Sequence, residues 1–449
     1  MGNAADPIDA DQKLQEDALM SYVASVNYSY GDKYYASFSF RRDGSSRLSP
    51  DTRWGNFWSL SASWRLSQEK FMQSLKSVLS DLKLRASYGV NGNLPSSYYG
   101  YQSTYTTGAF YNGKPSPWES TLGNEELTWE KNYALNLGLD IGLFSRVNVS
   151  LDWYTRTTKD LLMSKQLNSI SGFSSLLTNV GQMRNTGVEL EVRSNNIKTK
   201  DFSWTTAFNL SHNKNKILKL ADLPWFVDGR YVRKEGYPFN TIYLREYAGV
   251  DPETGSALYY DNQQDENGNY TKNKVTDPGQ ASPIPLKDIT PTISGGFMNT
   301  FNYKFIDLSF NLSYSFGGYS YDNASYILQD DGYSVISNKS TEQRRRWQKP
   351  GDITDVPRFV YGNKKGGNYN SSRAIHSTDH IRLKSLILGL NAPKAWLQKL
   401  GIGNARIYFS GTNLLTWAAY GQYDPEMSGV VGFYTPPLKT YAFGLELKF

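Results

Sequence analysis

Residues 131–144 read KNYALNLGLDIGLF, and the alternation in this stretch decides the fold. Asn, Ala, Gly and Asp occupy the positions between the apolar ones, which are Tyr133, Leu135, Leu137, Leu139, Ile141 and Leu143. A period of two residues is that of a β-strand with one apolar face. Strands of soluble proteins average about 5–6 residues, whereas a tilted strand needs about 9–11 residues to cross a bilayer. The stretch therefore predicts a membrane-spanning strand.

The same alternation recurs along the whole chain and predicts thirteen long strands. They lie at 20–30, 33–42, 55–66, 81–90, 133–143, 146–156, 183–195, 202–213, 291–303, 305–316, 380–391, 404–414 and 441–449. Tight links at 31–33, 143–145 and 304–305, or compact ones at 67–80 and 392–403, alternate with much longer excursions. Short turns on one side and long loops on the other are typical of a transmembrane β-barrel.

The number of strands indicates a larger barrel. An open strand edge in hydrocarbon leaves backbone groups without partners, so a spanning sheet has to close. Thirteen is odd, whereas bacterial single-chain barrels have even numbers of strands. We therefore expect residues 20–449 to be the C-terminal part of a barrel, after a polar leading segment at 1–19.

Composition restricts the function classes. The 449 residues are 14% aromatic, include 38 Gly and contain no Cys, which excludes thiol chemistry and Cys-ligated zinc. The formal charge of +6 is spread along the chain, so we expect no nucleic-acid partner. No apolar run reaches the ~18 residues of a membrane helix, and residues 1–17 lack a secretory signal pattern. If the protein is exported, we expect its true start to be missing. No phosphate loop, nucleophile elbow or carboxylate pair is present, so we expect no enzyme.

Several ordered motifs resemble the SusC/RagA group of TonB-dependent outer-membrane transporters. They are RRDGSSRL (41–48), SDLKLRASYGVNGN (80–93), LTWEKNYALNLGLDIGLF (127–144), NVGQMRNTGVELEV (179–192), AGVDPETG (248–255), RRRWQKPGDITDVPRF (344–359), IYFSGTNLLTW (407–417) and the closing strand. The resemblance implies an all-β fold, the C-terminal part of a plugged 22-stranded barrel. It also implies that the plug, through which TonB–ExbB–ExbD would act, lies outside this chain.

The resemblance further implies a function and its partners. The expected function is uptake of oligosaccharides, glycans or peptides across the outer membrane of a Bacteroidota-type Gram-negative cell. The expected partners are a SusD-like surface lipoprotein lid, the rest of the barrel, outer-membrane lipid and the cargo. Two alternatives remain: a TonB-dependent receptor for a siderophore or cobalamin, and a surface carbohydrate-binding protein rich in β-structure.

Aromatic residues in the predicted loops are the candidate cargo contacts, because flat rings stack on sugars and peptides. The alternative is that they pack the loops or form an interfacial girdle. The candidates are Tyr98, Tyr99, Trp118, Trp225, Phe226, Tyr231, Tyr319, Tyr321, Tyr326 and Trp347.

The closing residues YAFGLELKF combine a lipid-facing column with a possible assembly signal. Their apolar side chains are Tyr441, Phe443, Leu445, Leu447 and Phe449. The resemblance implies that a terminal aromatic is read by the outer-membrane barrel assembly machinery. The alternative is an ordinary lipid-facing strand.

Three polar motifs receive simpler interpretations. Arg344–Arg346 suits an anionic partner surface or a solvated loop. His376 and His380 have a spacing that clamps a metal on a helix, but His380 opens a predicted strand, so we expect no zinc. Asp261, Asp265, Glu266 and Asn267 faintly resemble a Ca²⁺ loop. A hydrated hairpin tip that turns at 267–268 is the better interpretation, and we expect no cofactor.

Overall fold

The computed structural model describes residues 14–108, 110–220, 223–334, 336–363, 370–393, 396–397 and 401–449. Residues 1–13 of the expected leading segment lie outside the described residues. None of the described helices is long and apolar enough to cross a membrane.

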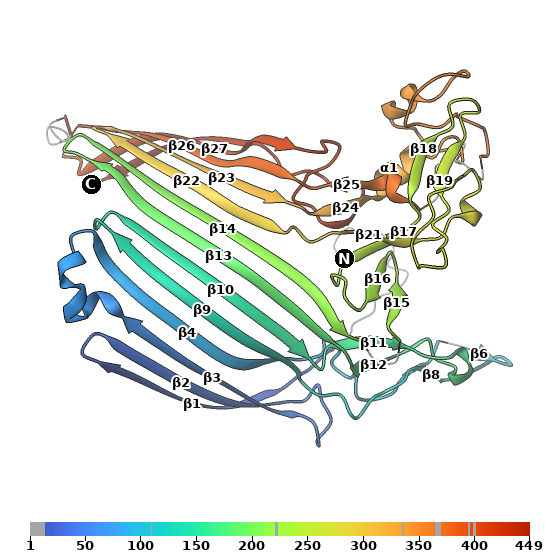
Figure 1. The fold of residues 1–449 in the computed structure, drawn as a ribbon, viewed down its shortest axis with the longest axis horizontal. Helices are drawn as coiled ribbons and strands as arrows, with labels where there is room; N and C mark the ends of the chain where they lie inside the picture. Colours follow the sequence, from blue (N-terminus) through green and yellow to red (C-terminus); the bar gives the residue numbers. More distant parts are fainter. Residues whose placement is uncertain are drawn as a thin grey trace.

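One antiparallel sheet contains all the predicted long strands. Within the described residues it has 13 strands in the order β1-β2-β3-β4-β9-β10-β13-β14-β22-β23-β26-β27-β29. Their bounds are β1 Leu19–Tyr30, β2 Tyr34–Ser45, β3 Trp54–Arg65, β4 Leu79–Asn93, β9 Glu130–Leu143, β10 Val147–Lys159, β13 Gln182–Lys198, β14 Phe202–Lys219, β22 Ile293–Tyr303, β23 Ile306–Phe316, β26 His380–Asn391, β27 Asn404–Ala418 and β29 Thr440–Lys448. Each pairs with its neighbour along the chain, so the sheet is a meander that curves into a barrel wall (Figure 1).

The longest connections between the wall strands all lie at one end of the wall. The short ones, including 31–33, 144–146 and 304–305, lie at the end where the C-terminus is marked (Figure 1). The compact connection between β3 and β4 holds the 3₁₀ helices Leu66–Gln68 and Lys70–Leu75 at that same end. All the long connections lie at the opposite end, which we call the outer end.

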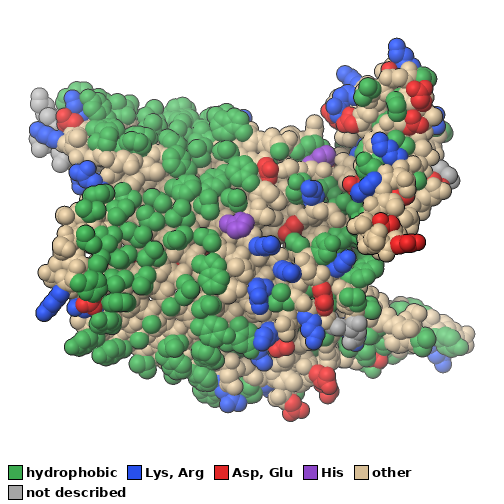
Figure 2. Space-filling view, viewed as in Figure 1, with side chains coloured by type: hydrophobic (Ala, Val, Ile, Leu, Met, Phe, Trp, Pro, Cys, Tyr) green, Lys and Arg blue, Asp and Glu red, His purple; other side chains and the backbone are tan. Residues whose placement is uncertain are grey.

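The wall has one apolar and one polar face, as the alternation in 131–144 predicts. Leu137 and its cross-strand partner Trp153 are exposed on the outside, and Figure 2 shows apolar side chains covering the strands there. On the lumen face, Arg85 of β4 donates from Nε to Asp140 Oδ2 at 2.8 Å and from Nη1 to Asp152 Oδ1 at 2.9 Å. Lipid on one side and a wet lumen on the other explain this division.

The long connections contain small sheets of their own. The connection 94–129 holds β5 Thr104–Thr106, β6 Phe110–Tyr111, β7 Lys114–Pro115 and β8 Trp118–Thr121, and 160–181 holds β11 Leu162–Gln166 and β12 Ser175–Asn179. The connection 220–292 holds β15 Trp225–Asp228, β16 Tyr231–Lys234, β17 Thr241–Leu244, β18 Tyr247–Val250, β19 Ala257–Tyr260, β20 Lys274–Val275 and β21 Ile284–Asp288. The last two hold β24 Tyr319–Asp322, α1 Asn323–Leu328, β25 Ile375–Ser377 and β28 Gly429–Val431. Short 3₁₀ turns lie at Ser169–Ser171, Pro278–Gln280, Thr341–Arg345 and Ser372–Ala374.

Candidate functional site

A small mixed sheet joins two outer connections that are distant in sequence. β24 pairs with β25 in antiparallel fashion within the connection 317–379. On its other edge, β24 pairs in parallel with β28 of the connection 419–439, with Tyr321 opposite Val430. This pairing places the second connection against the first at the outer end of the lumen wall.

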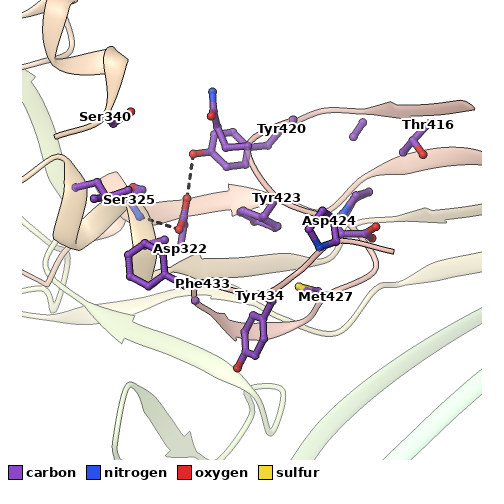
Figure 3. Close-up of a pocket in the computed structure, with 18 of the residues that line it drawn as sticks. Asp322, Ser325, Ser340, Thr416, Tyr420, Tyr423, Asp424, Met427, Phe433 and Tyr434 are labelled. Atoms are coloured by element: carbon purple, nitrogen blue, oxygen red, sulfur yellow. Dashed lines mark hydrogen bonds between the residues drawn. The ribbon is translucent and has the colours of Figure 1, made fainter. Parts of the chain in front are cut away.

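A pocket of about 600 Å³ lies between these two connections (Figure 3). This volume is in the range of small-molecule sites. Its wall combines α1 and Asp322 from one connection with the end of β27 and the segment 420–436 from the other. Four rings line it, which we call the pocket aromatics: Tyr420, Tyr423, Phe433 and Tyr434. Phe433 and Tyr434 are 69% and 63% exposed, so their faces are open to a ligand.

Asp322 links α1 to Tyr420 through two hydrogen bonds of its carboxylate. Its carboxylate caps α1, because the backbone N–H of Ser325 donates to Oδ1 at 2.9 Å. The hydroxyl of Tyr420 donates to Oδ2 at 3.1 Å (Figure 3). Asp322 is only 3% exposed, so this pair of bonds satisfies a carboxylate that would be costly to bury alone. One aspartate thus orients both the helix and the first pocket aromatic.

Two further contacts hold the aromatic side of the pocket. The rings of His376 and Tyr420 stack with centroids 3.7 Å apart and an angle of 2° between their planes. Tyr423 shares a short hydrogen bond with Ser320 through their hydroxyl groups. Burial lowers the pKa of His376, although Asp322 acts in the opposite direction. Burial also raises the pKa of Tyr420, and Asp322 raises it further.

The charged side of the pocket is an ion-pair cluster. Arg382 of β26 donates to Asp424 Oδ2 at 2.7 Å and to Glu426 Oε2 at 2.9 Å. The side chains of Arg382 and Asp424 are 3% and 7% exposed. The exposed rings of the pocket suit a ligand that offers flat surfaces for stacking.

The connections 220–292 and 317–379 pack into one lobe behind the pocket. Trp347 donates from its indole N–H to the carbonyl of Pro252 at 2.8 Å, and its ring covers Gly255. Arg373 reaches Asp331 from Nη1 at 2.6 Å in a buried ion pair. The two motifs at 248–255 and 344–359 are therefore neighbours in space.

The structure places five of the predicted cargo residues in the packing of this lobe and the wall beside it. Tyr321 is 1% exposed and packs with Ile242 and Leu244, so its ring cannot stack on a ligand in this conformation. Sequence reasoning could not separate such a core ring from an exposed one, because loops have no periodicity. The others in packed positions are Tyr231, Tyr326, Phe226 and Trp347.

The remaining predicted residues lie outside the pocket. Trp118, Trp225 and Tyr99 are exposed, and together with Tyr98 and Tyr319 they stay predictions as cargo contacts. Tyr98 carries the guanidinium of Arg47 over its ring, 4.2 Å from the centroid. Tyr319 carries the ammonium of Lys287 at 5.1 Å. Tyr98 and Tyr99 lie next to each other, with ring centroids 6.4 Å apart.

Sequence reasoning missed the four pocket aromatics. They lie in YGQYD (420–424) and GFYTPP (432–437), between the last two long strands. The signal was the density of Tyr, Phe, Gly and Pro in one short connection. Only the pairing of β28 with β24 shows that these rings face a cavity.

Residues of the three polar motifs, at 261–267, 376–380 and 344–346, form hydrogen bonds or ion pairs within the chain. Asp265 accepts at Oδ1 from the backbone N–H groups of Asn267 and Asn269, at 2.9 and 2.8 Å, and Gly268 has a φ of +79°, which is the expected hairpin tip. The ring of His380 lies 2.8 Å from the carbonyl of Thr378 through Nδ1. Arg345 of the basic triplet pairs with Glu342 at 2.5 Å.

The closing strand β29 pairs with β27 at the edge of the sheet. Tyr441, Phe443, Leu445, Leu447 and Phe449 are all exposed, as lipid-facing side chains would be. A role as an assembly signal stays a prediction.

Comparisons with known proteins agree with this architecture. The family model described as TonB dependent receptor-like, beta-barrel, matches residues 2–281. TonB-dependent receptor P3 of Formosa agariphila is 33% identical, with 97% of this chain and 46% of the relative covered. TonB-dependent receptor SusC of Bacteroides thetaiotaomicron is 30% identical, with 98% and 45% covered.

Solved structures give the same result. A structure of the RagAB peptide transporter matches with a TM-score of 0.89 and 30% identity, covering 100% of this chain and 50% of that one. The RagAB peptide importer in its open-open state matches with a TM-score of 0.87 and 30% identity, covering 100% and 49%. The chain spans about half the length of the relatives it matches. It belongs to the TonB-dependent receptor family and forms part of that family's outer-membrane β-barrel, with SusC and RagAB among its relatives.

Proposed function

We propose that the full-length protein is a TonB-dependent importer of a nutrient oligomer, a glycan or a peptide, and that the pocket between the outer connections contacts the cargo. The observation that carries this proposal is the pocket of about 600 Å³ with two open aromatic rings at the outer end of the wall. Membership in the family, with SusC and a peptide transporter among the relatives, supports import over catalysis. The family argues against the alternative of a surface carbohydrate-binding protein.

We also propose that a SusD-like lipoprotein covers the outer end. The connections 220–292 and 317–379 form a packed lobe far larger than a barrel needs for its turns, and large ordered loops usually bind something. Purification of the full-length protein from native membranes should recover such a lipoprotein in a fixed ratio. Recovery of the barrel alone under mild detergent contradicts this part of the proposal.

Growth of a deletion strain tests the import proposal. A strain that lacks the gene should lose growth on one glycan or one peptide mixture supplied as the only carbon source. Replacing both Phe433 and Tyr434 by Ala should then raise the cargo concentration needed for half-maximal growth. We expect about 2- to 10-fold per ring, because one aromatic contact contributes about 0.5–1.5 kcal/mol.

A matched variant and an opposite result complete the test. Tyr111 is 79% exposed, similar to Phe433 and Tyr434, but lies on β6, outside the pocket, so a Tyr111→Ala strain should grow as the wild type does. Normal growth of the deletion strain on every polymer, with loss of growth on a siderophore under iron limitation, would favour the siderophore-receptor alternative.

A further inference from the structure

Arg382 lies on the lumen face of β26, directly beneath the connection 419–439. Its strand neighbours are Ser313 on β23 and Thr416 on β27. The preceding residue in the chain, Ile381, is exposed on the apolar outside of the wall. The barrel wall therefore points one guanidinium inward, beside the pocket.

Every nitrogen of this guanidinium has an acceptor. Nε donates to Thr416 Oγ1 at 3.1 Å, while Nη2 and Nη1 donate to Asp424 and Glu426. Lys384, which lies at a bulge in the same strand, adds an ion pair to Glu426 at 2.6 Å. Asp424 Oδ1 also accepts from the backbone N–H of Glu426 at 2.9 Å, so a hydrogen bond within the turn 424–426 supports the carboxylate that Arg382 binds.

This turn lies between the two halves of the aromatic side of the pocket. Tyr420 and Tyr423 precede it, and Phe433 and Tyr434 follow it. The turn contacts the barrel wall through Arg382 and Lys384, whereas Tyr420 and β28 contact the other connection. A forked guanidinium that bonds two carboxylates fixes both distance and angle, which an ammonium cannot do.

We propose that Arg382 is a positioning residue for cargo binding: it clamps the turn 424–426 to β26 and thereby holds the pocket aromatics in place. The consequence for cargo affinity rests on the proposed function, whereas the clamp itself does not. Removing Arg382 leaves a buried carboxylate at Asp424 without its cation, and such a group pulls the turn toward water.

A second arginine on the same wall provides a matched control. Arg406 of β27 pairs with Asp307 of β23 at 2.6 Å, and Asn391 of β26 donates to the same carboxylate at 2.8 Å. This group lies near the short-turn ends of its strands, away from the connection 419–439. Arg406→Gln removes a lumen-face ion pair whose side chains are more exposed, at 21% and 19%, but leaves the clamp intact.

Amide hydrogen exchange of the full-length protein in detergent tests the clamp without any cargo. Arg382→Gln should speed exchange in residues 419–439 by about 10- to 100-fold, the equivalent of one lost charged hydrogen bond. Arg406→Gln should leave exchange in 419–439 unchanged. Arg382→Lys keeps the charge but loses the fork, so its exchange should be intermediate. It also provides the test if the Gln variant does not fold.

Wild-type exchange in 419–439 for a folded Arg382→Gln variant would overturn the clamp. The consequence for cargo is measured separately, as the half-maximal growth concentration on the polymer identified with the deletion strain. Faster exchange with an unchanged growth concentration would overturn the positioning role while leaving the import function intact. The import function is refuted by a different outcome, namely normal growth of the deletion strain on every polymer.

Discussion

Replacing Gly138 by Ala tests how closely the lumen face of the wall is packed. Gly138 lies between Arg85 on β4 and Asp152 on β10, its cross-strand partners. A Cβ at this position would lie 2.5 Å from Arg85 Cζ and 2.6 Å from Asp152 Oδ1. The guanidinium crosses the glycine to reach both Asp140 and Asp152, so an added methyl group must displace it.

The expected cost follows from the bonds that the displacement breaks. Arg85 donates to both oxygens of Asp140 and both of Asp152. Hydrogen bonds to charged groups contribute about 1.5–3 kcal/mol when buried, but these side chains are 19–33% exposed. Allowing for solvent, we expect the free energy of unfolding to fall by about 1–3 kcal/mol.

Gly296 on β22 is the matched control. A Cβ there would have its nearest neighbour at 3.5 Å, which is ordinary contact, so Gly296→Ala should change the free energy of unfolding by less than about 0.5 kcal/mol. Urea unfolding of the full-length protein in lipid vesicles measures both. Arg85→Gln should show the same loss as Gly138→Ala, and the two should not add, because each removes the same bonds. Equal stability of the two Ala variants, or additive losses, would refute the reasoning.

Three further predictions concern the lipid face, a titrating residue and the lobe. Leu137→Arg should cost about 2–4 kcal/mol of unfolding free energy if it lies near the midplane, and Asn136→Arg much less; equal losses in urea unfolding would contradict the face assignment. Because burial lowers the folded pKa of His376, its contribution to stability is complete above the unfolded pKa of about 6.5 and is lost as pH falls toward the folded value. The protection of amides in 419–439, measured relative to the intrinsic exchange rate at each pH, should therefore decrease below that pH in the wild type but not in His376→Gln. Gly255→Ala should displace the ring of Trp347, since its Cβ would lie 2.4 Å from Trp347 Cδ2; limited proteolysis should then cut 344–359 faster with the barrel still heat-modifiable on gels.

The sequence determined the barrel strands because the bilayer imposes a strict pattern on them. Each spanning strand has lipid on one face and water on the other, so 133–143 alternates over its whole length and lies within β9, which begins three residues earlier at Glu130. The pattern fades where that constraint ends. Alternation predicted a strand that stops at 213, whereas β14 continues to Lys219 through NKNKILK, near the outer connections where both faces are largely polar.

The pocket, by contrast, was decided by tertiary structure alone. Nothing local distinguishes Tyr321, which is buried in the lobe, from Tyr434, which is open to the pocket, because both occur in irregular connections rich in Tyr and Gly. The positions of these rings depend on contacts between segments far apart in the chain. These contacts are the parallel pairing of β24 with β28 and the ion pair of Arg382 with Asp424. The bilayer constrains every residue of a spanning strand, so its effect is visible in the local sequence pattern. A pocket between loops depends on contacts between distant segments, which no local pattern records.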